Sequence, residues 1–212
     1  MPEVFKDFDI KAFFTRKNYR FENISTIFMP IQKHTDKVWI LEEKEQFPVI
    51  ADGIITPLKK IFIGVKVADC LPVLIYDPVR EIIGAVHSGW RGTAAGILKK
   101  TLFAMEKRFN CKVSNIILAF GPSIKGCCYE VGEEVLEAVS HQTPSKEFIM
   151  RRNGKYHIDI AKANLLQALS LGVRYENIWI SEDCTYCKNT EYASYRFHGK
   201  KAGRQYGVIG ML

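Results

Sequence analysis

Three mainly apolar runs that follow one another closely constrain the fold of this 212-residue chain more than any other feature. They span residues 61–67, 73–76 and 82–87, and the turn sequence Asp77-Pro78-Val79-Arg80 separates the last two. Short apolar runs bounded by turn residues are typical of buried strands. The sequence therefore predicts three strands, the last two of which form a hairpin.

Both strands and helices are predicted in the rest of the chain. Further strands are expected over residues 116–120, 177–180, 192–196 and 206–212. Helices are expected over residues 93–108 with Thr93 as the N-cap, over 131–141, and over 159–171, where Asp159 is the N-cap and Gly172 ends the helix. Because strands and helices do not alternate strictly, this pattern favours an α+β fold over a doubly wound sheet.

Length and composition predict a single domain in the cytoplasm. A chain of this length can bury one sizeable core and no linker divides it, so residues 1–212 are expected to form one domain. Residues 1–7 carry acids where a secretory signal would be basic and then apolar. The apolar region 61–76 is too short for a transmembrane helix. Six cysteines without a secretion signal indicate a reducing compartment.

The net charge of +7 raises the question of a nucleic-acid partner. The Lys and Arg residues are spread along the chain, often beside acids as in Glu42-Glu43-Lys44-Glu45, and no predicted helix carries a continuous basic stripe. This distribution favours a solvated surface that helps to attract anionic small molecules. The sequence indicates neither a nucleic-acid nor a membrane partner, and it predicts no particular oligomeric state.

Polar groups lie near the ends of two of the predicted strands. Asp69 and Cys70 come shortly after the first strand, and His87 ends the third. The hairpin turn can bring His87 near Cys70, and His34, in the polar segment 32–38, offers a third group. Two imidazoles and one thiolate suit zinc, and three protein ligands leave a fourth position open, as in catalytic sites. The alternative is that Cys70 is a core residue, because free cysteine is among the most buried residue types.

Arginine residues near these groups predict an anion-binding site. Arg91 lies at the start of the predicted helix 93–108, where free backbone N–H groups and the helix dipole favour an anion. On spacing alone, Arg91 can equally pair with an acid such as Asp69. Arg196 and Arg204 form a second small basic cluster that can fold back over the site. Asp69 is expected to orient a ligand or to move a proton.

No second metal site is expected from the remaining cysteines and histidines. Cys184-Thr185-Tyr186-Cys187 has the spacing of half a zinc knuckle, but the chain has no second Cys-x-x-Cys pair and no His-x-x-x-His. Cys184 and Cys187 are therefore interpreted as structural, and the adjacent Cys127 and Cys128 are poor candidates for a disulfide with each other. The other histidines are interpreted as non-ligands: His141, His157 and His198.

Five groups of motifs follow one another along the chain: Ala51-Asp52-Gly53-Ile54-Ile55-Thr56, Val67-Ala68-Asp69-Cys70-Leu71-Pro72, Val86-His87-Ser88-Gly89-Trp90-Arg91-Gly92-Thr93, Gly121-Pro122-Ser123-Ile124 with Cys128-Tyr129-Glu130-Val131, and Ser194-Tyr195-Arg196 with Gly203-Arg204. Together they resemble the polyphenol oxidase or laccase-domain family, which is also described as purine nucleoside phosphorylases and as peptidoglycan editing factor. The resemblance extends from about residue 30 to residue 212.

The resemblance implies a single-domain α+β sandwich with mostly antiparallel strands and a zinc ion held by His34, Cys70 and His87. It also implies phosphorolysis of adenosine, inosine, guanosine and methylthioadenosine, and deamination of adenosine. The expected catalytic residues are Asp69, Cys70 and Arg91, and the expected substrate-binding residues are Gln32, Arg91, Arg196 and Arg204. Family members usually carry a longer N-terminal region with a Gly-Gly-Val-Ser-like turn and an Asn-Arg pair, and neither occurs before His34 here.

The residues also allow the functions linked to this family to be compared. A copper oxidase is less expected than a zinc enzyme, because a trinuclear copper cluster needs many imidazoles and the chain has five His with no His-x-His pair. A purine nucleoside enzyme is favoured, since zinc lowers the pKa of a bound water to about 7 and arginines can hold phosphate. The alternatives are a hydrolase that edits a peptidoglycan precursor by amide cleavage, and a metal-stabilised binding module without turnover.

Overall fold

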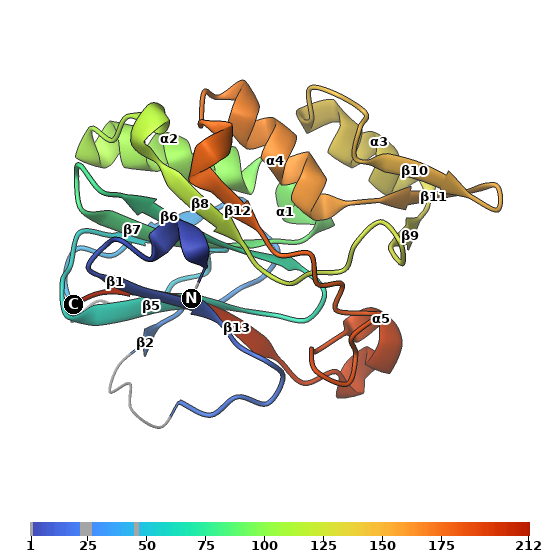
Figure 1. The fold of residues 1–212 in the computed structure, drawn as a ribbon, viewed down its shortest axis with the longest axis horizontal. Coiled ribbons are helices and arrows are strands. Elements are labelled where there is room, and N and C mark those ends of the chain that lie inside the picture. Colours follow the sequence, from blue (N-terminus) through green and yellow to red (C-terminus); the bar gives the residue numbers. More distant parts are fainter. Residues whose placement is uncertain (1, 22–26, 45–46) are drawn as a thin grey trace.

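The structure is a computed structural model that describes residues 2–21, 27–44 and 47–212. Its main elements form three layers, with helices above a six-stranded sheet and a four-stranded sheet on the other side of it (Figure 1). This mixed arrangement confirms the predicted α+β class. Seven of the ten described strand pairings are antiparallel, as expected.

The six-stranded sheet has the strand order β12-β8-β6-β7-β4-β3. Its strands are β3 (Val38–Ile40), β4 (Gly53–Thr56), β6 (Leu71–Asp77), β7 (Ile82–Ser88), β8 (Ile117–Phe120) and β12 (Ile178–Ile180). Strands β6 and β7 form the predicted hairpin, in which Leu71 pairs with Ser88 and Pro72 with His87. Strands β8 and β12 are parallel neighbours, so both end at the same edge of the sheet.

The four-stranded sheet has the order β1-β13-β5-β2. It consists of β1 (Ile10–Phe14), β2 (Ile27–Phe28), β5 (Ile61–Val67) and β13 (Gln205–Met211). The first of the three apolar runs, β5, thus belongs to a different sheet from the hairpin that follows it. A small third sheet contains β9 (Glu130–Val131), β10 (Ile149–Arg152) and β11 (Lys155–Ile158).

The hairpin of β6 and β7 is covered on both faces, which explains why its strands are apolar without alternation. Val73 and Ile75 belong to the core cluster under the helices, whereas Leu74 and Tyr76 belong to the cluster between the two large sheets. Full burial of one large apolar side chain contributes about 1.5–3 kcal/mol. Side chains of the hairpin therefore pack into both cores, and this packing fixes the position of the residues at its open end.

The helices are α1 (Trp90–Ala94), α2 (Ile97–Phe109), α3 (Glu133–Gln142), α4 (Ile160–Ser170) and α5 (Tyr195–His198). Short 3-10 helices also occur at η1 (Glu3–Phe5), η2 (Val113–Asn115), η3 (Tyr175–Asn177) and η4 (Gly199–Lys201). Helix α4 confirms the predicted cap, because the Asp159 carboxylate accepts a hydrogen bond from the Lys162 backbone N–H at 3.0 Å. In the described part of the chain, no helix is long and apolar enough to span a membrane.

Three local predictions were wrong. The helix expected over 93–108 is split into α1 and α2 at Gly96, whose φ of 71° lies in the left-handed region. Thr93 is not a cap but a buried residue of α1, and its hydroxyl donates to the Gly89 carbonyl at 3.0 Å. The strand expected over 192–196 is absent there; instead, Ser194 caps α5 by accepting a hydrogen bond from the Phe197 backbone N–H.

Candidate active site

A cavity of about 600 Å³ opens where the β6–β7 hairpin meets α1 and α5, a size usual for small-molecule sites. Its lining includes every site residue that the sequence predicted: Gln32, His34, Asp69, Cys70, His87, Arg91, Arg196 and Arg204. Residues that are far apart in the chain therefore meet at one place.

Three side chains on the cavity wall can hold one metal ion. Their ligand atoms, from His34, Cys70 and His87, all lie within 4.8 Å of one another. The hairpin register places His87 opposite Pro72, so Cys70, two residues before Pro72, lies beside the end of β7. His34 comes from the loop before β3, and its ring centroid lies 4.8 Å from that of His87. This set leaves room for a fourth ligand from the cavity.

A buried carboxylate, Asp52, holds two of these ligands in place. One of its oxygens accepts hydrogen bonds from His87 Nδ1 at 2.7 Å and from the His34 backbone N–H at 3.1 Å. The other accepts from the Thr35 backbone N–H at 2.6 Å, from the Thr35 hydroxyl at 2.8 Å and from the Lys33 backbone N–H at 3.2 Å. Because His87 donates from Nδ1 to Asp52, its Nε2 is left to bind a metal.

The charges of these groups favour a thiolate. Burial alone would raise the pKa of the Cys70 thiol, but the charge of His87 and hydrogen bonds from His34 and His87 lower it to about 6. Burial opposes the charge on His87, yet the Cys70 thiolate and the Asp52 carboxylate raise the His87 pKa to about 9. Without a metal, Cys70 and His87 therefore form a thiolate–imidazolium pair at neutral pH. A thiolate is the form of cysteine that binds metals.

Gly89 leaves the space that the ligands need. A Cβ atom built at this position would lie 2.8 Å from the Cys70 sulfur and 3.4 Å from Cδ2 of His34. Such a contact is shorter than real Cβ atoms make, so a side chain here would displace the thiolate. The backbone conformation does not require a glycine here, since a φ of −81° is accessible to any residue. The glycine is required because a side chain would collide with the metal-binding groups.

The three predicted arginines reach the cavity in different ways. Arg91 stacks on the ring of Trp90, with 4.3 Å between the guanidinium carbon and the ring centroid. In the part of the chain that the structure describes, Arg91 forms no ion pair, so the alternative that it pairs with Asp69 is wrong. Arg196 donates to the Glu130 carbonyl at 3.0 Å. Arg204 donates to the carbonyl of Gly203.

Asp69 and Gln32 both bind neighbouring protein segments. The Asp69 carboxylate accepts hydrogen bonds from the Thr185 hydroxyl and from the Arg196 backbone N–H, both at 2.6 Å. The amide of Gln32 exchanges two hydrogen bonds with the backbone of Lys66, at 2.8 and 2.9 Å. Each of these side chains therefore positions the cavity wall, and Asp69 in particular joins the start of the hairpin to α5.

Sequence reasoning assigned no role to Asp52 or Tyr129, although both lie in the quoted motifs. Tyr129 lines the cavity, and the guanidinium of Arg196 lies 5.1 Å from its ring centroid. Burial and the Cys70 thiolate raise the pKa of Tyr129 to about 12, so its hydroxyl keeps its proton at neutral pH. The available signal for Asp52 was an acid beside the short apolar stretch of the motif Ala51-Asp52-Gly53-Ile54-Ile55-Thr56.

The fold and the site define an α+β protein of two stacked sheets with a Cys and two His as metal-binding groups at the edge of one sheet. Residues 14–212 match the family model described as "Multi-copper polyphenol oxidoreductase laccase". The chain belongs to this family.

Several relatives have names that describe nucleoside chemistry. The chain is 39% identical over 181 residues to "Purine nucleoside phosphorylase" of Aquifex aeolicus, a match that covers 84% of this chain and 79% of that protein. It is 35% identical to "Adenosine deaminase RL5" from an unknown prokaryotic organism, over 88% of this chain and 76% of that one. The crystal structure of YlmD from Geobacillus stearothermophilus aligns with a TM-score of 0.82 at 28% identity, covering 87% of this chain and 73% of that one.

Proposed function

We propose that this protein is a zinc-dependent purine nucleoside enzyme. Its reactions would be phosphorolysis of adenosine, inosine, guanosine and methylthioadenosine, and deamination of adenosine. The observation that carries the proposal is the set of His34, Cys70 and His87, which faces a cavity that also contains Arg91 and Arg196. The names of the relatives from Aquifex aeolicus and from the unknown prokaryote support the same two reactions.

The donor set supports zinc as the metal. Two imidazole nitrogens and one thiolate match a zinc site that has three protein ligands and an open position. Asp52 fixes the ring of His87 in the orientation and tautomer that this requires. When bound, zinc supplies a Lewis acid that polarises a substrate oxygen and lowers the pKa of water to about 7.

The arginines support phosphate as the second substrate. Phosphorolysis joins a phosphate oxygen to C1′ of the ribose while the bond from C1′ to the purine nitrogen breaks, so phosphate must be held close to the sugar. Arg91 has no ionic partner among the described residues, and its ring contact with Trp90 leaves its N–H groups able to bind an anion. Arg196 is held beside Tyr129 on the same cavity. We assign phosphate binding to these two arginines.

A multicopper oxidase is poorly supported by the positions of the histidines. The described residues contain two clusters of metal-binding side chains, and these include only two of the five histidines, His34 and His87. Reduction of oxygen by four electrons needs a trinuclear centre with many more imidazole ligands. The site fits one metal ion, so the nucleoside reactions remain the better proposal.

The proposal is tested by incubating purified protein with adenosine, with and without phosphate, and separating adenine from inosine. We expect adenine and ribose 1-phosphate to form only with phosphate, and inosine to form without it. Both activities should disappear after treatment with a chelator and return with zinc. The His87→Ala variant is the matched control for activity that depends on this site.

Absence of both products from zinc-loaded, folded protein would contradict the proposal. In that case the same preparation should be incubated with a peptidoglycan precursor, and release of an amino acid would identify the site as an amide hydrolase. Activity that survives unchanged in His87→Ala would place the chemistry elsewhere.

A further inference from the structure

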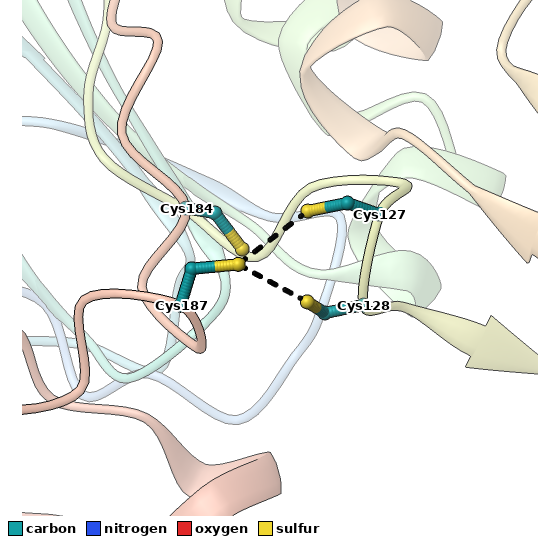
Figure 2. A group of neighbouring side chains, drawn as sticks. All are labelled: Cys127, Cys128, Cys184 and Cys187. Carbon is teal, nitrogen blue, oxygen red and sulfur yellow. Dashed lines mark hydrogen bonds between the residues drawn. The ribbon is translucent and has the colours of Figure 1, made fainter.

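Four cysteines outside the cavity meet in one cluster, although the two pairs lie far apart in the sequence. Their sulfur atoms, from Cys127, Cys128, Cys184 and Cys187, all lie within 4.8 Å of one another. Figure 2 shows the four side chains turned toward a common point. The interpretation of Cys184 and Cys187 as isolated structural residues rested on the lack of a second Cys-x-x-Cys. The partner pair is instead the adjacent Cys127 and Cys128.

The sheet explains why these two pairs meet. Cys127 and Cys128 lie in the loop that follows β8, and Cys184 and Cys187 lie in the segment that follows β12. Because β8 and β12 are parallel neighbours, both segments leave the same edge of the sheet. Ser123 and Cys184 then form an isolated parallel bridge, with the Thr185 backbone N–H donating to the Ser123 carbonyl at 3.2 Å.

Burial in a hydrophobic core does not explain the cluster. Cys184 is buried, but Cys127 and Cys128 are only partly buried and Cys187 is exposed. A cysteine that serves as a small apolar residue is normally buried in a core. Here one buried thiol is instead grouped with two partly buried thiols and one exposed thiol, between two loops.

The distances fit a single metal ion held by four thiolates. A tetrahedral zinc site with bonds of about 2.3 Å places its sulfurs about 3.8 Å apart. The Cys187 sulfur lies 3.8 Å from that of Cys127 and 3.3 Å from that of Cys128. The Cys187 sulfur therefore has two neighbouring sulfurs at about the distance that separates the ligands of a tetrahedral zinc site. The four sulfurs are also too close together to enclose a polynuclear iron–sulfur cluster.

Hydrogen bonds and charge around the cluster suit a metal–thiolate centre. The Lys125 backbone N–H donates to the Cys184 sulfur at 3.4 Å. A divalent ion with four thiolates carries a net negative charge, and Arg152, which donates to the Cys127 carbonyl at 3.2 Å, places a cation next to it.

We infer that Cys127, Cys128, Cys184 and Cys187 form a second, structural metal site that binds zinc. The geometry supports a closed site, because all four ligands come from the protein. Its role would be to join the loop after β8 to the segment before α5. Tyr129 directly follows Cys128, and Thr185, which donates to Asp69, lies inside the other pair. The ion would therefore fix one wall of the cavity without taking part in its chemistry.

The inference is tested by measuring zinc per chain in full-length protein purified under reducing conditions without chelators. We expect two zinc ions in the wild type, one in Cys187→Ser, one in Cys70→Ser and none in the double variant. Cys111→Ser is the matched control and should retain both ions, because Cys111 is a buried cysteine that belongs to neither cluster. Zinc loss in Cys187→Ser reports on the four-cysteine site, and zinc loss in Cys70→Ser reports on the site of the proposed function, so failure of one proposal can be distinguished from failure of the other.

A second measurement keeps the test valid if Cys187→Ser does not fold. Metal-free Cys70→Ser protein is titrated with cobalt(II), and a site with four thiolates should give strong sulfur-to-cobalt charge-transfer absorption at one equivalent. The inference is overturned if folded Cys70→Ser binds neither zinc nor cobalt. It is also overturned if mass spectrometry after alkylation shows that the four cysteines form disulfides in the reduced, freshly purified protein.

Discussion

Replacement of Asp52 by Asn should show how far one buried carboxylate controls the candidate metal site. The Asn side chain has two possible orientations, because its NH₂ group can take the place of either carboxylate oxygen of Asp52. On one side this group would face three donors from Lys33 and Thr35, and on the other it would face only His87 Nδ1 and the His34 backbone N–H. The second orientation is less costly. It requires His87 to accept at Nδ1, so the proton moves to Nε2 and blocks metal binding there.

The size of the effect follows from the pKa of Asp52. Burial opposes ionisation of this carboxyl, but hydrogen bonds from His87 and Thr35 lower its pKa from 3.8 to about 2. That difference corresponds to about 2.5 kcal/mol in favour of the carboxylate. Loss of this stabilisation should lower the melting temperature by roughly 5–10 °C for a chain of this length. Metal affinity should fall by about 10–100-fold, as for other residues that orient a ligand.

The pH dependence gives this prediction a definite sign. A carboxyl whose folded pKa is below its unfolded pKa stabilises the fold above the unfolded value, and this stabilisation is lost as the pH falls through the folded value. The difference in free energy of unfolding between wild type and Asp52→Asn should therefore be constant above about pH 5 and shrink toward about pH 2. Urea unfolding of metal-free protein at several pH values measures it.

Thr35→Val is the matched control for Asp52→Asn. In the wild type, the Thr35 hydroxyl donates to the same carboxylate but forms no hydrogen bond with His87. This variant should lose about 1 kcal/mol of stability and keep wild-type metal affinity in competition with a chromophoric chelator. Wild-type metal affinity in Asp52→Asn, or equal affinity losses in both variants, would refute the argument that Asp52 sets the tautomer of His87.

Three further substitutions test other parts of the structure. Gly89→Ala should weaken metal binding by about 10-fold or more, because its Cβ would lie 2.8 Å from the Cys70 sulfur, and metal analysis after dialysis would show this. Arg91→Ala should raise the phosphate concentration needed for nucleoside cleavage by about 10–100-fold with unchanged metal content, and equal losses of cleavage and deamination would contradict its assignment to phosphate. Asn164→Ala should lower the free energy of unfolding by about 1–3 kcal/mol, because the buried hydroxyls of Thr93 and Ser88 lose hydrogen bonds of 3.0 and 3.1 Å; an unchanged urea midpoint would oppose this.

The elements that depend on local sequence were predictable. The hairpin of β6 and β7 follows from two apolar runs around a turn, and α4 follows from its periodicity and its Asp159 cap. The association of Cys70 with His87 could be predicted because a hairpin fixes its own register. The role of His34 could be proposed only as an available third group, since its position depends on hydrogen bonds to Asp52 from the loop before β3.

The remaining features depend on contacts between distant segments. No local pattern reveals that β5 pairs with β13 instead of joining the hairpin, and the break between α1 and α2 depends on the backbone of a single glycine, Gly96. The four cysteines were missed for the same reason. Their proximity depends on the parallel pairing of β8 with β12, which aligns two segments about sixty residues apart, as the separation of Cys127 and Cys187 shows.

The place of β13 in the four-stranded sheet has a consequence for the order in which the protein can fold during synthesis. This strand lies between β1 and β5, although it is formed by residues 205–211. All strands of the six-stranded sheet occur by residue 180, so that sheet is synthesised in full before the strand that joins β1 and β5. The nascent chain would then expose the apolar face of the hairpin that β5 and β13 later cover. Completion of the cavity, whose lining includes Arg204 directly before β13, would follow the synthesis of this strand.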